Sequence, residues 1–262
     1  MQAFSDDSPQ ILEREDGAKI AYHFTQRTDE TKPTGVIFCG GLRSDMEGSK
    51  ALALEDWCRA EGRAFLRFDY TGHGQSSGTF EETCIGDWAK DALCALDTLT
   101  EGPQVIVGSS MGGWVSLMVA RDRPERIQAL LGLAAAPDFT EDLMWQELTP
   151  EQRENLMTEG QVAVPNDYDP NDPYIISKLL IEDGKNHLLL REPLNIQKPV
   201  RLIQGMKDAD VPWQTALKIQ DALVTDDVEI QFIKTGDHRL STDTDLMRLT
   251  RTLGALLSDI EG

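Results

Sequence analysis

Short apolar runs rich in β-branched residues alternate with longer segments of helical period along most of this chain. Strands are expected at residues 18–24, 34–39, 63–69, 103–109, 127–134, 199–205 and 227–233. Helices are expected at residues 48–61, 84–99, 111–122, 213–224 and 243–260. Strands that alternate with helices form parallel sheets covered on both faces. The pattern therefore predicts an α/β fold with a mostly parallel, doubly wound sheet.

One segment, residues 138–192, interrupts the alternation because it shows no convincing buried strand. It contains helical pieces at Glu141–Leu148, Pro150–Met157 and Tyr174–Leu190, and a stretch rich in Pro, Asn and Asp at 165–173. A loop this long inside a compact domain is usually functional. We therefore predict a core made of residues 1–137 and 193–262, with a small helical cap inserted at 138–192, which we call the cap segment.

The composition excludes several classes of partner. The 262 residues carry a formal net charge of −20, so the surface repels nucleic-acid phosphates and anionic lipid headgroups. No apolar run approaches the roughly 18 residues that span a bilayer. We expect no nucleic-acid binding and no membrane insertion, and a monomer or small homo-oligomer.

The compartment is predicted from the cysteines and the first residues. The four cysteines form no C-x-x-C pair and no zinc-ligand spacing, which favours a reducing environment. Residues Met1–Asp7 are acidic and lack the features of a signal or transit peptide. We expect a cytoplasmic protein.

A candidate nucleophile lies in Gly108-Ser109-Ser110-Met111-Gly112, which fits G-x-S-x-G. An apolar run precedes the motif and a helical segment follows it, which is the context of a nucleophile elbow. Such a turn exposes the central serine above the sheet, and the helix N-terminus favours a negative oxygen beside it. The motif predicts Ser110 as the nucleophile, with Ser109 in the wrong register.

A serine needs a base and an orienting acid. In this arrangement the order along the chain is serine, acid, histidine. Of the four histidines, His238 follows the last expected strand, whereas His73 is expected to be structural. Asp208 follows residues 199–205 and is the predicted acid. Asp210 is the first alternative, and Asp138 at the start of the cap segment is a more distant one.

Two backbone N–H groups are expected to form an oxyanion hole. Met111 follows the nucleophile and supplies one. The second is expected from the loop Cys39-Gly40-Gly41-Leu42, with Leu42 N–H as the predicted donor.

These residues are typical of serine hydrolases that transfer an acyl group to water, with no cofactor and no metal. Amidases, C–C bond hydrolases and perhydrolases share the same triad and stay open as alternatives, as does a non-catalytic binding protein. A haloalkane dehalogenase needs aspartate at the elbow, where this chain has Ser110. Apolar residues of the cap segment are expected to roof an acyl pocket: Leu143, Met144, Trp145, Leu148, Ile175, Ile176, Leu179 and Leu180.

Five short stretches together resemble one branch of the α/β-hydrolase superfamily: G-G-L, D-Y-T-G-H-G-Q-S, G-S-S-M-G-G-W, G-M-K-D-A-D-V-P-W and D-H-R. That branch includes the mitochondrial palmitoyl-protein thioesterase that is also an acyl-glucuronide esterase. The resemblance runs from about Gly35 to the C-terminus and implies the α/β-hydrolase fold. It also implies an acyl-protein or acyl-glucuronide substrate and puts the family's nucleophile, acid and base on Ser110, Asp208 and His238. Because residues Met1–Asp7 lack the features of an import segment, we expect a bacterial-type relative of that branch.

Overall fold

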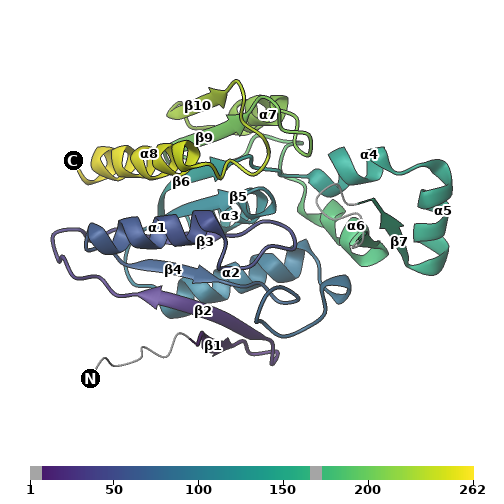
Figure 1. The fold of residues 1–262 in the computed structure, drawn as a ribbon, viewed down its shortest axis with the longest axis horizontal. Coiled ribbons are helices and arrows are strands. Elements are labelled where there is room, and N and C mark those ends of the chain that lie inside the picture. Colours follow the sequence, from purple (N-terminus) through teal and green to yellow (C-terminus); the bar gives the residue numbers. More distant parts are fainter. Residues whose placement is uncertain (1–7, 166–172) are drawn as a thin grey trace.

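The computed structural model describes residues 8–165 and 173–262 and shows an eight-stranded sheet flanked by helices (Figure 1). The strand order is β1-β2-β4-β3-β5-β6-β9-β10. The six strands β4, β3, β5, β6, β9 and β10 of this sheet run parallel to one another. Strand β2 is antiparallel to both of its neighbours, β1 and β4. Their bounds are β1 Gln10–Glu13, β2 Lys19–Thr25, β3 Gly35–Cys39, β4 Phe65–Phe68, β5 Gln104–Ser109, β6 Ile127–Leu133, β9 Val200–Gly205 and β10 Val228–Ile233.

Helices cover both faces of the sheet and enclose two hydrophobic clusters. α1 (Ser49–Ala60) and α8 (Asp243–Glu261) pack on one face, and α2 (Ile85–Leu99), α3 (Met111–Asp122) and α7 (Gln214–Ala222) pack on the other. Successive side chains of a strand point to opposite faces. In β3, Val36 and Phe38 accordingly join the cluster under α1 and α8, whereas Ile37 and Cys39 join the cluster under α2, α3 and α7. The central strands are buried on both sides, and the fold class predicted from the alternation is confirmed.

The expected strands and helices of the core are present to within one or two residues at each end. The sequence pattern missed β1, a four-residue strand that pairs antiparallel with β2 at the sheet edge. Most of its residues are exposed, so it carries no continuous apolar run. A 3₁₀ turn, η1 (Phe80–Glu82), precedes α2.

The cap segment forms a separate lobe beside the sheet (Figure 1). It contains η2 (Thr140–Met144), α4 (Trp145–Glu147), α5 (Pro150–Glu159), β7 (Gln161–Val164), β8 (Tyr174–Ser177), α6 (Lys178–Gly184) and η3 (Lys185–His187). The segment was expected to hold helical pieces and no buried strand. The sequence pattern missed β7 and β8, which form a separate antiparallel pair outside the main sheet. The helix expected at Tyr174–Leu190 therefore starts only at Lys178, after Ser177 accepts a hydrogen bond from Leu180 N as its N-cap.

Two predicted features lie partly or wholly outside the described residues: the acidic Met1–Asp7 and residues 166–172 of the Pro/Asn/Asp-rich stretch. Within the described residues, none of the helices combines the length and the apolar character that crossing a bilayer requires.

Candidate active site

Ser110 lies on a sharp turn between β5 and α3, with φ 55° and ψ −120°. This left-handed backbone is unfavourable for a residue with a side chain. The turn is tight because two neighbouring glycines allow close backbone contact. A Cβ on Gly108 would lie 2.4 Å from Gly112 O, and one on Gly112 would lie 2.0 Å from Cys39 O. The strand–turn–helix context that the motif predicts is present.

A chain of hydrogen bonds joins Ser110, His238 and Asp208. Ser110 Oγ lies 3.0 Å from His238 Nε2, and His238 Nδ1 lies 2.9 Å from Asp208 Oδ2. Since a carboxylate only accepts hydrogen bonds, Nδ1 carries the hydrogen and Nε2 is free to accept from the serine hydroxyl. The arrangement can take a proton from Ser110 and hold it on an imidazolium beside a carboxylate.

Asp208 is held in the β9–α7 connection by four hydrogen bonds. Its Oδ1 accepts from Asp210 N and Val211 N, and its Oδ2 accepts from Gln204 Nε2 in addition to His238. Its side chain is completely buried, whereas Asp210 is exposed at the cavity wall. The structure thus brings Asp208, and not the alternative Asp210, onto the imidazole.

The loop after β3 approaches the nucleophile closely. A Cβ on Gly41 would lie 3.4 Å from Ser110 Cβ. Ser44 closes the loop, because its N–H and its Oγ both donate to Gly41 O, at 3.2 and 2.7 Å. Leu42 on this loop and Met111 at the first position of α3 both line the cavity beside Ser110. These are the two positions predicted to supply the oxyanion-hole donors.

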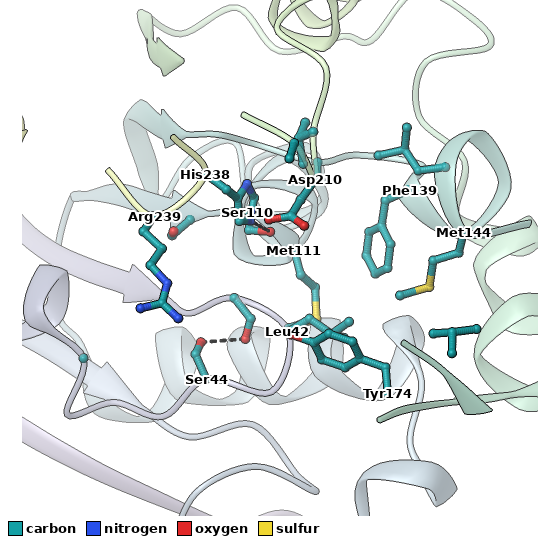
Figure 2. Close-up of a pocket in the computed structure, with 18 of the residues that line it drawn as sticks. Leu42, Ser44, Ser110, Met111, Phe139, Met144, Tyr174, Asp210, His238 and Arg239 are labelled. Carbon is teal, nitrogen blue, oxygen red and sulfur yellow. Dashed lines mark hydrogen bonds between the residues drawn. The ribbon is translucent and has the colours of Figure 1, made fainter. Parts of the chain in front are cut away.

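Ser110 and His238 face a cavity of about 910 Å³ between the sheet and the cap segment. Figure 2 shows Phe139 and Met144 on one side of Ser110, and Arg239 and Ser44 on the other. The cap segment contributes an apolar wall made of Phe139, Leu143, Met144, Leu148, Val164 and Ile176. The core contributes a polar wall that includes Ser44, Asp45, Lys50, Asp210, Arg239 and Ser241.

The predicted pocket roof is correct in part. Leu143, Met144, Leu148 and Ile176 line the cavity. Trp145, Ile175, Leu179 and Leu180 are not among the lining residues that the structure describes. Phe139, Val164 and Tyr174 line it but were missed. Phe139 lies in the connection that leaves the carboxyl end of β6 at Leu133. Since the carboxyl ends of parallel strands border such sites, its position was the available signal.

The other three histidines lie in different surroundings. His23 on β2 lies 3.5 Å from Glu47, and His187 on η3 lies 3.4 Å from Asp183. His73 is buried, with its Nδ1 3.2 Å from Thr71 O, and burial lowers its pKa to about 4. The structural role expected for His73 agrees with this environment.

Asp138 was the most distant candidate for the acid, and it serves another purpose. Its carboxylate is fully buried and accepts hydrogen bonds from Leu189 N at 2.8 Å and Leu190 N at 2.9 Å. Arg191 Nη1 lies 3.2 Å away. Asp138, the first residue of the cap segment, therefore binds residues close to the end of the same segment, at its base.

Among the described residues, one group has the side chains of a possible metal site: Asp208, Asp210 and His238, whose ligand atoms lie within 4.8 Å of one another. Asp208 and His238 are already hydrogen-bonded to each other, and His238 is also bonded to Ser110. A metal at this place would displace the contacts that orient the imidazole, so the group fits proton transfer better than metal binding.

A family model for the α/β-hydrolase fold matches residues 38–191. The chain belongs to the α/β-hydrolase family. It is 38% identical to the bovine mitochondrial palmitoyl-protein thioesterase ABHD10 over 95% of this chain and 80% of that protein. The structure of mouse ABHD10 superposes with a TM-score of 0.88, at 38% identity, covering 96% of this chain and 99% of that one. A crystal structure of an Agrobacterium vitis S4 protein superposes at 0.89, with 35% identity, covering 94% of this chain and 96% of that one.

These similarities confirm the resemblance drawn from the five sequence stretches: the protein is an α/β-hydrolase related to the ABHD10 thioesterases. They extend over nearly the whole chain, cap segment included.

Proposed function

We propose that this α/β-hydrolase is a serine esterase or thioesterase that works through an acyl-enzyme. The observation that carries the proposal is the hydrogen-bonded series Ser110–His238–Asp208 at the floor of a cavity with an apolar wall. A non-catalytic binding protein has no need of a serine on a strained turn bonded to an oriented imidazole.

The mechanism follows from the positions of the groups. Ser110 Oγ attacks the acyl carbonyl while His238 Nε2 takes its proton, and Asp208 stabilises the resulting imidazolium. The N–H groups of Met111 and Leu42 stabilise the tetrahedral oxyanion. His238 then protonates the leaving alcohol or thiol, which leaves an acyl ester on Ser110. In the second half His238 activates a water molecule that releases the acid.

The proposed substrates are acyl thioesters or esters with an apolar acyl chain, such as acylated proteins or acyl glucuronides. Two observations support this class. The related bovine and mouse proteins are named palmitoyl-protein thioesterases, and the cap segment gives the cavity an apolar wall. Burial of an apolar chain stabilises its binding by about 0.8 kcal/mol per methylene. Such a wall therefore favours substrates with apolar acyl chains over substrates with polar acyl groups.

The test is labelling with a fluorophosphonate, together with hydrolysis of p-nitrophenyl esters, an acyl thioester and an anilide. The native protein should label and should cleave esters and thioesters faster than the anilide. Ser110→Ala should lose labelling and at least about a thousandfold of hydrolysis, because triad members act as a unit.

Ser109→Ala is the matched control, since it removes the neighbouring hydroxyl and leaves the elbow serine in place; it should still label. Full hydrolysis by purified Ser110→Ala would contradict the proposal. A native protein that cleaves the anilide best would favour an amidase instead.

A further inference from the structure

The loop that carries Leu42 contains a residue in an unusual conformation. Gly41 to Ser44 form a four-residue turn closed by the hydrogen bond from Ser44 N to Gly41 O at 3.2 Å. Arg43, at the third position, has φ 53°. A positive φ at that position favours glycine, because a side chain there is strained. Favourable contacts of the Arg43 side chain can offset this strain.

Those contacts reach both the core and the cap segment. The Arg43 guanidinium lies over the Phe80 ring, 5.7 Å from its centroid, and over the Tyr174 ring, 5.5 Å from its centroid. Phe80 belongs to η1 of the core, and Tyr174 begins β8 of the cap segment. Arg43 Nη1 also donates to Pro173 O at 3.4 Å. A guanidinium within about 6 Å of an aromatic face is attracted to it.

We propose that Arg43 is a positioning residue. By contacting Phe80 on η1 and Tyr174 on β8, it holds the strained turn that presents Leu42 N–H to the oxyanion. The position of the cap segment against the core thereby controls the position of this N–H donor. The proposal rests on the proposed function, since it assigns Leu42 its oxyanion role. A turn of this kind changes type when the peptide between its second and third residues rotates. That peptide joins Leu42 to Arg43 and adjoins the peptide that carries Leu42 N–H. Release of Arg43 allows the rotation, which shifts Leu42 and with it the neighbouring N–H donor.

The consequence is a loss in the chemical step without a loss in substrate affinity. Removal of an oxyanion-hole donor lowers kcat by about a hundredfold to a thousandfold, so displacement of one donor should lower it by about tenfold. The ground-state carbonyl depends less on that donor, so KM should change by less than about twofold. A merely structural residue would not produce this split.

The experiment uses the full chain and p-nitrophenyl acetate, whose acyl group is too short to depend on the apolar wall. Arg43→Ala should lower kcat by about tenfold with KM nearly constant. Arg43→Lys keeps the charge but loses the planar contact with the rings, so its kcat should lie between those of the native protein and Arg43→Ala. The matched control is Arg153→Ala, because Arg153 makes the same kind of contact with Trp145, at 5.1 Å, inside the cap segment. Its kcat should stay within about twofold of native.

A double-mutant cycle tests the link to the cap segment. Tyr174→Leu should also lower kcat, and the double variant with Arg43→Ala should be no slower than the slower single variant. The two variants Arg43→Ala and Arg153→Ala should have similar melting temperatures (Tm) in thermal unfolding. The proposal is overturned by a kcat of Arg43→Ala within about twofold of native, by a loss confined to KM, or by effects that multiply in the cycle. If instead Ser110→Ala stays active, the proposed function itself fails.

Discussion

At the scale of single residues, the acid of the proposed triad is defined by its hydrogen bonds. Each oxygen of Asp208 accepts two hydrogen bonds: two from backbone N–H groups on Oδ1, and two from Gln204 and His238 on Oδ2. An asparagine amide in this place would turn a donor toward other donors, either at the backbone or at the imidazole. The carboxylate is therefore required both to orient His238 and to hold its own loop.

We expect Asp208→Asn to lower kcat/KM by about ten-thousandfold, since the imidazole then adopts the wrong tautomer. Asp210→Asn, two residues away on the same loop, keeps the carboxylate beside the imidazole and should lower kcat/KM by less than about tenfold. Ester hydrolysis by both purified variants checks this. If Asp210→Asn were the more damaging change, the acid would be assigned to the wrong residue.

His73 makes the stability of the protein depend on pH. Its Nδ1 faces Thr71 O, and its ring packs edge-on against Tyr70, Phe80 and Trp88. Its Nε2 has no hydrogen-bond partner among the described residues. A second N–H here would lie in apolar surroundings, which is why burial lowers the pKa from 6.5 to about 4.

The unfolded chain binds this proton first, so the protein should lose stability as the pH falls from about 6.5 to about 4. Protonation of the unfolded chain at His73 lowers the free energy of unfolding by about 3 kcal/mol across that pH range. Above about pH 6.5 the contribution of His73 to stability is fully present. Denaturant unfolding of native protein and His73→Asn at several pH values measures it. Asparagine still donates to Thr71 O but does not titrate, so the variant should show a flatter dependence. Equal slopes for the two proteins would refute the assignment.

At the scale of elements, the sequence was informative wherever periodicity was strong. The buried strands β3, β5 and β6 are largely apolar because both faces of the sheet are covered there, and their positions were predictable. β8 was not, because only Ser177 and Lys178 separate its apolar residues from the apolar residues at the start of α6. Periodicity does not separate a short strand from the start of a helix.

The same limit applies to the site. Ser110 was predicted from the elbow motif, and His238 from chain order and its place after the last strand. The structure puts their side chains within hydrogen-bonding distance of each other. The cation–π contacts of Arg43 were not predictable from the sequence. They join its loop to η1, about 40 residues further along the chain, and to β8, about 130 residues further along. No local pattern encodes such a contact.

The base of the cap segment gives a prediction at this scale. Asp138→Asn should destabilise the protein by about 1–3 kcal/mol, because one of the buried N–H groups of Leu189 and Leu190 loses its acceptor. Asp142→Asn is the control: it breaks a partly exposed ion pair with the same Arg191 and should cost less than about 1 kcal/mol. Urea unfolding compares the two. Equal destabilisation would show that Asp138 acts only through Arg191.

At the scale of the whole molecule, the cavity depends on two layers that the chain builds separately. The sheet provides Ser110, Asp208 and His238 at the carboxyl ends of β5, β9 and β10. The cap segment, inserted between β6 and β9, lies beyond those same ends and supplies the apolar wall (Figures 1 and 2). Under the proposed function the reacting side chains lie at the sheet and the apolar wall selects the acyl chain, so changes confined to that wall should alter selectivity.

We therefore predict that kcat/KM rises with acyl length from acetyl onward, by up to about fourfold per methylene, until the cavity is filled. Met144→Trp should shorten the usable cavity, because the larger side chain fills space on the apolar wall beside Phe139 (Figure 2). It should lower kcat/KM for palmitoyl and octanoyl substrates while that for acetyl changes little. Leu179→Trp, on an exposed position of the cap segment outside the cavity lining, is the matched control and should keep the native slope. The measurement is kcat/KM across acetyl, butyryl, octanoyl and palmitoyl esters for the three proteins. A native preference for acetyl, or equal slopes in Met144→Trp and Leu179→Trp, would show that the apolar wall does not select the acyl chain.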